Sequence, residues 1–75
     1  MDNKTLRIIR GAIAMKSKKN KDLAFALKLA PATLSEFLHG YRPMPYHVQE
    51  YLIKELDIRQ TIQASNEQEA LLVMA

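Results

Sequence analysis

Apolar residues recur every three or four positions along most of this chain, a pattern that predicts amphipathic α-helices rather than strands. The first helix is predicted from Thr5 to about Lys16, with Thr5 or Asn3 capping its start. Its apolar positions are Leu6, Ile8, Ile9, Ala12, Ile13 and Met15. Gly11 lies in its middle, where glycine weakens a helix by about 0.5–1 kcal/mol relative to alanine, and close packing is the only reason for it that the sequence suggests.

Two short helices with a tight break between them are predicted from Asn20 to Gly40. The first covers Lys21 to Lys28, and Asn20 is its predicted N-cap. The second opens at Pro31, because proline is favoured at the first helical position. It closes at Gly40, because glycine tolerates the left-handed conformation that ends many helices.

The second of these helices has an apolar face and a face of small and polar residues. The apolar face consists of Leu34, Phe37 and Leu38. The opposite face consists of Ala32, Ser35, Glu36 and His39. One face therefore belongs to the core, and the other is suited to lie against another molecule, as in a helix-turn-helix whose second helix is exposed.

A proline-rich link follows Gly40 and separates it from a fourth predicted helix. Pro43 and Pro45 make this link stiff and extended, because proline cannot continue a helix through it. Pro45 is predicted to be the first position of a helix that runs from Tyr46 to Leu56. The apolar face of that helix consists of Val48, Tyr51, Leu52 and Leu56.

The tail, residues 59–75, has two separate helix signals. Ile58 and Ile62 are one turn apart and predict a short fifth helix, for which Asp57 is a candidate cap. Ser65 with Gln68 matches a capping box, which predicts that a last helix starts there. Its apolar end consists of Leu71, Leu72, Val73 and Met74. About ten residues cannot hold a helix alone in water, so this end docks on its own domain, docks on another chain or stays loose; we predict that it forms part of a dimer contact.

The composition limits the chain to one small domain. It has 75 residues, 48% of them apolar, and no cysteine, so neither a disulfide nor a thiolate metal site can stabilise it. We predict an all-α, compact bundle of about four to five short helices, with a helix-turn-helix domain at residues 1–58 and a helical tail at residues 59–75. No apolar run approaches the roughly 20 residues of a membrane span, and the N-terminus lacks a signal-peptide core. We therefore expect a cytoplasmic protein without a membrane partner.

The net charge of +3 is unevenly distributed along the chain. Residues 1–28 contain eight Lys or Arg against two Asp, a net charge of +6, whereas residues 29–75 contain three Lys or Arg against six Asp or Glu, a net charge of −3. A basic half joined to an acidic half suggests one side that faces a polyanion. The alternative is that the lysines only keep a small protein soluble, and the charge alone leaves both interpretations open.

Three short motifs occur in a characteristic order and spacing. They are Leu23-Ala24, Thr33-Leu34-Ser35 and Gly40. Together they resemble the repressor/Cro-like (lambda-repressor-like, XRE-type) helix-turn-helix family of phage and bacterial regulators, which has Asn-Gly where this chain has His39-Gly40. The segment from Tyr51 to Ile58 resembles the family's fourth helix, so the resemblance covers about residues 5–58. It implies a sequence-specific DNA-binding transcriptional regulator that acts as a dimer, with its third helix in the major groove of double-stranded DNA.

The resemblance also implies which residues meet the bases. In the family these are the first two residues of the third helix and a residue about one turn later. The positions carried over in this way are Pro31, Ala32 and Glu36, with Ser35 beside them. Pro31 and Ala32 can offer only apolar contact, for example to a thymine methyl group, whereas Glu36 either accepts a hydrogen bond from cytosine N4 or is a solvated helix residue. The family often has Gln or Arg on this helix. The base-contacting surface predicted here therefore has few hydrogen-bond donors by comparison.

Phosphate contacts are expected on both sides of the third helix. The predicted residues are Lys18, Lys19, Asn20, Lys21, His39, Tyr41 and Arg42. By resemblance, Asn20 takes the role of the family's polar cap residue and Arg42 that of the basic residue after the third helix, although the linker before Asn20 is longer than in the family. The lysines would add sequence-independent attraction, and Tyr41 either donates its hydroxyl to phosphate or packs over Leu38.

Little in the sequence favours catalysis. There is no cysteine, no glycine-rich phosphate loop and no recognisable setting for a serine nucleophile, so we expect neither an enzyme nor a cofactor. Glu36 and His39 could share a metal ion, but two ligands do not make a site, and no metal is expected. The alternative to a DNA-binding regulator is a helix-turn-helix module that binds another protein, such as an antitoxin, an antirepressor or a regulator partner. Glu36 and the apolar C-terminus favour that alternative, and the basic half and the spaced motifs favour DNA.

Overall fold

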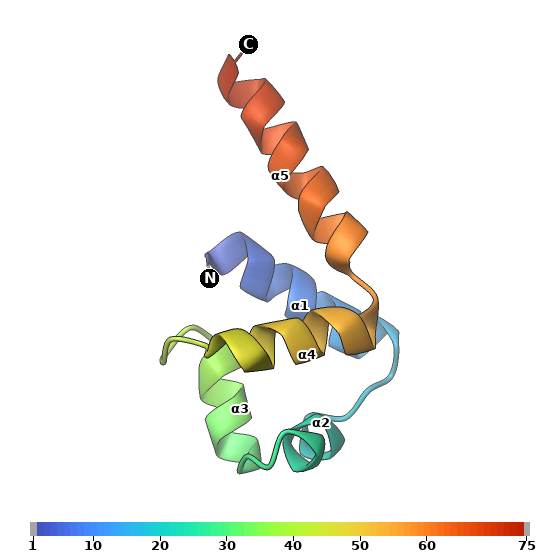
Figure 1. Cartoon of the computed structure of the whole chain (residues 1–75), viewed down its shortest axis with the longest axis vertical. Helices are drawn as coiled ribbons and strands as arrows, with labels where there is room; N and C mark the ends of the chain where they lie inside the picture. The colour runs from blue at the N-terminus through green and yellow to red at the C-terminus, as the bar shows by residue number, and fades with distance from the viewer. Residues whose placement is uncertain (1, 75) are drawn as a thin grey trace.

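Five helices make up the part of the chain that the computed structural model describes, which is the backbone of residues 2–74 and the side chains of residues 2–68. They are α1 (Asn3–Met15), α2 (Asn20–Ala26), α3 (Pro31–Leu38), α4 (Tyr46–Leu56) and α5 (Arg59–Met74) (Figure 1). No strand occurs among these described residues, so the predicted all-α class is confirmed. None of the helices in this part of the chain is long and apolar enough to cross a membrane.

The core forms where the apolar faces of α1, α3 and α4 meet, and α2 closes one side of it. The largest fully buried side chains are Ile9, Leu34, Leu38, Val48, Leu52 and Leu56, all of them on faces predicted from the helical spacing. Leu23 and Ala24 of α2 are buried with them. Met15 does not belong to this core, because it is 87% exposed, and its assignment to the apolar face of the first helix was wrong.

The starts of α1 and α2 differ from the prediction. Asp2, rather than Thr5 or Asn3, caps α1, because Oδ1 of its carboxylate accepts a hydrogen bond of 2.8 Å from the backbone N–H of Thr5. Asn20 is the first residue of α2 and not its N-cap. The cap position belongs to Lys19, whose carbonyl accepts hydrogen bonds from the backbone N–H groups of the third and fourth residues after it.

Single residues with positive φ end α2 and α4. Lys28 has a φ of 59° and turns the chain out of α2, so the helix ends at Ala26 instead of continuing to Lys28. Asp57 has a φ of 53° and is the C-cap of α4, so it does not cap a following helix as predicted. Such left-handed conformations are uncommon outside glycine, and neither was predicted from the sequence.

The ends of α3 are those predicted. Pro31 is its first residue, and Gly40, with a φ of 77°, turns the chain beyond its C-terminus. The backbone N–H of Tyr41 donates to the carbonyl of Glu36 at 2.9 Å, and the N–H of Gly40 donates to the carbonyl of Phe37 at 3.2 Å. These two bonds form a Schellman motif, the helix ending for which glycine is best suited. Pro45 differs slightly, because it is the N-cap of α4 and not its first residue.

The tail forms one helix where the sequence predicted two. α5 passes through Ser65 without a break, so the capping-box signal there was wrong. Ile62 and Ser65 are half-buried, whereas the side chains from Asn66 to Gln68 are exposed. Figure 1 shows α5 rising from the body on the side away from α2 and α3. The radius of gyration is accordingly 12.9 Å, against about 11 Å expected for a compact chain of this length.

The residues predicted for dimerisation lie at the end of this arm. They are Leu71, Leu72, Val73 and Met74. Their side chains lie outside the described residues.

Candidate nucleic-acid interface

α2 and α3 form the part of the fold from which the candidate site is built. They are joined by residues 27–30 and pack against each other, burying Leu23 and Ala24 on one side and the apolar face of α3 on the other. The remaining surface of α3 faces outward. This arrangement is compatible with a helix-turn-helix whose second helix is presented to a partner.

The predicted base-contacting residues lie along the outer surface of α3. Pro31 and Ala32 are exposed at its N-terminus, and Ser35 and Glu36 are half-buried one turn later. The exposed pair carries no bulky side chain, so the backbone at the start of α3 can approach another surface closely. Beside it lies Phe25, which is 84% exposed although it is aromatic.

Phe25 was not identified from the sequence as a surface residue, although its position on the helical wheel indicates that it is exposed. It falls off the face of α2 that Leu23 and Ala24 define, and an aromatic residue away from the apolar face must lie in solvent. In the structure it lines a shallow hollow with Lys21 and Pro31. An apolar ring thus adjoins the start of α3, next to a predicted phosphate-binding lysine.

The predicted phosphate-contacting residues are all exposed, but they do not form one cluster. Lys18 lies 3.7 Å from a carboxylate oxygen of Glu55 on α4, and both side chains are about two fifths exposed, so this ion pair is weak and screened. Lys19 lines the same hollow beside α4. Asn20 instead shares a hollow with His39 at the far end of α3, so the fold brings these two together.

The residues that follow α3 are organised around its last carbonyl groups. Nδ1 of His39 lies 2.9 Å from the carbonyl oxygen of Ser35, and because a carbonyl can only accept, Nδ1 donates. The imidazole ring stacks on the ring of Tyr41 with centroids 6.1 Å apart. Tyr41 is 81% exposed, which argues against the alternative that it packs over Leu38 as a core residue.

A short ion pair joins Glu36 to Arg42. Nε of Arg42 lies 2.6 Å from Oε2 of Glu36. The Arg42 side chain is 60% exposed and the Glu36 side chain 40%, so the cation is the outer member of the pair. The carboxylate of Glu36 is therefore already engaged, and its predicted contact with cytosine N4 would compete with Arg42.

Arg10 fixes the C-terminus of α3 from outside the helix-turn-helix. Nη1 of this α1 residue donates to the carbonyl oxygen of Leu38 at 2.6 Å. A cation at a helix C-terminus also interacts favourably with the helix dipole. The sequence placed Arg10 only on a polar face of the first helix, and nothing in its spacing indicated a bond to a residue 28 positions away.

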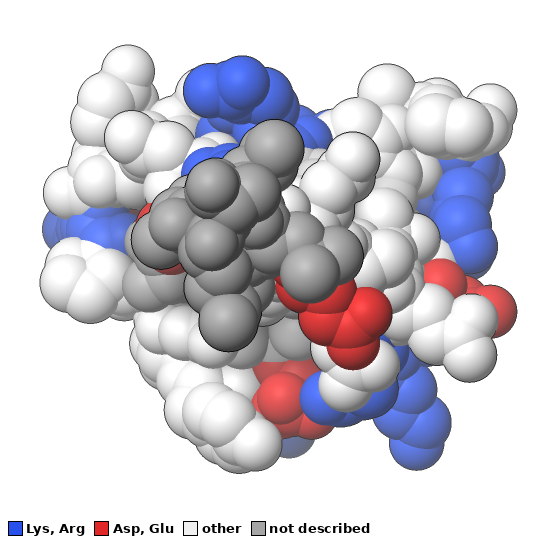
Figure 2. All heavy atoms as spheres, turned by 90° about the horizontal axis from the view of Figure 1, so that it is seen from above, with Lys and Arg blue, Asp and Glu red and all other residues white. Residues whose placement is uncertain are grey.

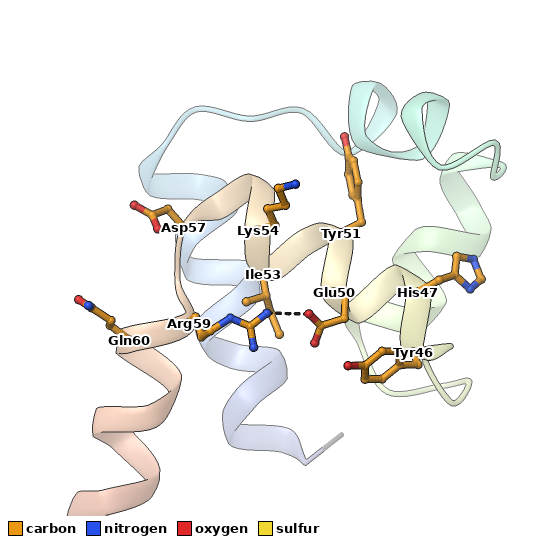
Figure 3. Close-up of a pocket in the computed structure, with 9 residues that line it drawn as sticks. All are labelled: Tyr46, His47, Glu50, Tyr51, Ile53, Lys54, Asp57, Arg59 and Gln60. Carbon is orange, nitrogen blue, oxygen red and sulfur yellow. Dashed lines mark hydrogen bonds and ion pairs between the residues drawn. The ribbon is translucent and has the colours of Figure 1, made fainter.

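Another concavity lies between α4 and the start of α5. Tyr46, Glu50 and Ile53 line it along α4, and Arg59 faces them from α5, with Nη2 of Arg59 2.6 Å from Oε2 of Glu50 (Figure 3). Its volume is about 980 Å³. Among the residues with described side chains, no three His, Asp or Glu residues lie close enough together to hold a metal ion.

The face from which α5 projects carries charges of both signs. Lys and Arg side chains lie there next to Asp and Glu side chains (Figure 2). Glu50 of α4 and Arg59 of α5 form one ion pair of opposite charges. Such a mixed surface has no continuous positive field to attract a polyanion. Comparisons of the chain with protein-family models, with curated proteins and with solved structures found no match.

Proposed function

We propose that this protein is a small transcriptional regulator that binds double-stranded DNA, with α3 in the major groove. The observation that carries the proposal is the exposed start of α3, where Pro31 and Ala32 leave the helix backbone open to close approach. A major groove about 12 Å wide admits an α-helix, whose N-terminal residues then meet the base edges. The apolar contacts that Pro31 and Ala32 can make suit thymine methyl groups.

Exposed donors flank α3 and would bind the phosphates. Lys21 lies beside its N-terminus, and His39 and Arg42 follow its C-terminus. Lys19 precedes α2 and has an exposed side chain. Phosphate contacts of this kind fix the position of the protein on the duplex and make the affinity strongly salt-dependent.

A dimer would place two copies of α3 on one operator. α5 leaves the body on the side away from α2 and α3, so two copies could join through α5 without covering α3. A two-fold arrangement of this kind presents two recognition helices to half-sites about one helical turn apart.

The proposal is tested by measuring binding to a random duplex of about 20 base pairs, two helical turns, between about 50 and 200 mM salt. We expect affinity to fall steeply over this range. Lys19→Ala and Lys21→Ala should each reduce the slope of log affinity against log salt by about 0.9 if each lysine meets one phosphate.

Lys54→Ala is the matched control, because Lys54 is an exposed lysine on α4 that lines the concavity beside α5. Its loss should leave both the affinity and the salt slope unchanged. Absence of binding at low salt, or equal effects of all three substitutions, would contradict DNA binding by α2 and α3.

A protein-binding module is the second candidate function. The concavity between α4 and α5 favours it, because Tyr46 at its rim is 74% exposed and aromatic residues are enriched in protein interfaces. The same binding measurement separates the two functions. If the protein does not bind duplex DNA at low salt, and if Tyr46→Ala abolishes binding to a protein partner, the protein belongs to this second class.

A further inference from the structure

We infer that Glu36 is a positioning residue for Arg42, which it holds in place to bind a DNA phosphate, and is not a reader of cytosine. The inference rests on the proposed DNA-binding function and assigns a different role to one residue of that site. Charge alone would make DNA binding stronger when the negative charge of Glu36 is removed, whereas this inference predicts weaker binding.

Glu36 holds the segment after α3 at two points. Its carbonyl accepts the backbone N–H of Tyr41 at 2.9 Å, and its carboxylate meets Nε of Arg42 at 2.6 Å. Gly40 makes this possible, because its φ of 77° turns the chain back so that Arg42 comes alongside the last turns of the helix it follows. The backbone just before Arg42 and the side chain of Arg42 thus each have a contact that orients them relative to α3.

The ion pair with Glu36 leaves part of the Arg42 guanidinium group available for a second partner. A guanidinium group has five N–H donors, and the carboxylate of Glu36 engages it through Nε, so donors on the two terminal nitrogens remain. Arg42 is the more exposed partner, so a polyanion that approaches this end of α3 meets the guanidinium before the carboxylate. Planar, multiply donating arginine is well suited to phosphate oxygens.

A phosphate is the acceptor that fits the position of Arg42. In a helix-turn-helix, the N-terminal residues of the recognition helix meet the base edges. Arg42 lies beyond the C-terminus of α3, together with His39 and Tyr41, at the opposite end from Pro31 and Ala32. The contact would therefore add affinity without sequence preference.

Two effects of Glu36→Gln oppose each other, and their sum decides the question. Removing a negative charge near a polyanion should strengthen binding to every sequence. Loosening Arg42 should weaken it, because a glutamine amide oxygen still accepts from Nε but without the charge, and a rotamer-rich side chain must then be ordered further on binding. That ordering corresponds to a loss of about two- to tenfold in affinity, and we expect it to be the larger effect because the screened charge acts at a distance.

The test is a double-mutant cycle of Glu36→Gln and Arg42→Gln, measured on duplexes selected for binding and on their single-base variants. We expect Glu36→Gln to lower affinity about two- to tenfold on all of these duplexes alike. In the Arg42→Gln background the same substitution should cause no further loss. Glu50→Gln is the matched control, because Glu50 forms an ion pair of the same length with Arg59 on the α4–α5 side, and it should leave binding unchanged.

The salt slope and the melting temperature separate positioning from a general effect on the fold. Arg42→Gln should lower the salt slope by about 0.9, whereas Glu36→Gln leaves the phosphate contact in place and should keep the slope; the melting temperature of both variants should stay that of the control variant. Higher affinity for Glu36→Gln, a changed preference at one base pair, or a loss that persists without Arg42 would overturn the inference while DNA binding stands. Failure of the unsubstituted protein to bind any duplex would overturn the proposed function and this inference with it.

Discussion

Gly40 and Gly11 allow the same substitution to be made in two opposite settings. Gly40 has a φ of 77°, and a Cβ built on it lies 3.4 Å from Cδ1 of Leu6. Gly11 lies inside α1, and a Cβ built there meets nothing within 4 Å, so the close packing suggested for it from the sequence is wrong. We predict that Gly40→Ala destabilises the protein and that Gly11→Ala stabilises it.

The magnitudes follow from the backbone. The left-handed conformation costs an L-residue with a Cβ about 1–2 kcal/mol, and the contact with Leu6 is at an ordinary van der Waals distance and adds little. Gly40→Ala should therefore lower the free energy of unfolding by about 1–2 kcal/mol. Gly11→Ala removes the penalty of glycine in a helix and should raise it by about 0.5–1 kcal/mol.

Urea denaturation followed by far-UV circular dichroism measures both changes, and each kcal/mol corresponds to about 4–8 °C in melting temperature for a domain of this size. Gly40→Asn is the control for the mechanism, because asparagine tolerates the left-handed region and should recover part of the loss. A Gly40→Ala variant as stable as the parent would refute the left-handed closure of α3. Destabilisation by Gly11→Ala would show that the surface around Gly11 is covered in solution.

Two further predictions concern the ends of the chain. Hydrogen bonds from the Thr5 side chain, and then from its backbone N–H, lower the pKa of the Asp2 carboxyl below 3.8, so its capping contribution is present above that pH and is lost as pH falls through the lowered value. Asp2→Ala should therefore reduce the free energy of unfolding by about 0.5–2 kcal/mol at neutral pH and by progressively less in acid. Asp2→Asn is a comparable cap without a charge, so its stability relative to Asp2→Ala should not depend on pH. A constant difference between the parent and Asp2→Ala across the acid range would refute the role of the charge. Deleting residues 66–75 should convert a dimer into a helical monomer in sedimentation experiments, and a full-length protein that is already monomeric at high micromolar concentration would contradict dimerisation through α5.

The sequence predicted the elements whose signals are periodic. Leu34, Leu38 and Leu52 are buried where the helical spacing placed them, because burial of one face is the reason for that spacing. Pro31 and Gly40 bound α3 as predicted, since each residue type has a specific backbone preference. The same reasoning predicted the burial of Met15 wrongly, because Met15 lies at the edge of the apolar face. At that edge the helical period alone does not separate core residues from exposed ones.

The features that were missed depend on tertiary contacts or on uncommon backbone states. Lys28 and Asp57 adopt positive φ without being glycine. Lysine does not predict this state, and the aspartate, a residue type enriched in it, was interpreted as the cap of the following helix. The bond from Arg10 to Leu38 joins residues that only the packing of α1 on α3 brings together. Ser65 matched a capping signal, yet inside a continuous helix its neighbours' backbone groups already have partners, so the signal has no effect.

For the candidate site, the exposure of its residues could be predicted but their pairing could not. The outward faces of Ala32 and His39 follow from the helical wheel. The pairing of Glu36 with Arg42 requires the direction in which the chain leaves Gly40 and the rotamers of two long side chains. The sequence therefore presented Glu36 as a free acceptor, and the structure places it against a cation.

The junction between α4 and α5 is short, so a small change in its backbone angles produces a large displacement at the far end of α5. Asp57 and the buried Ile58 are the only residues between the two helices, and α5 with its 16 residues extends about 24 Å beyond them. A change of about 10° in the backbone at Asp57 would move the far end of α5 by about 4 Å. The distance from α3 to anything bound at that end, a second copy included, would depend on the dihedral angles of Asp57. It would also depend on the contacts that hold the start of α5, which are those of buried Ile58, half-buried Ile62 and the Arg59–Glu50 ion pair.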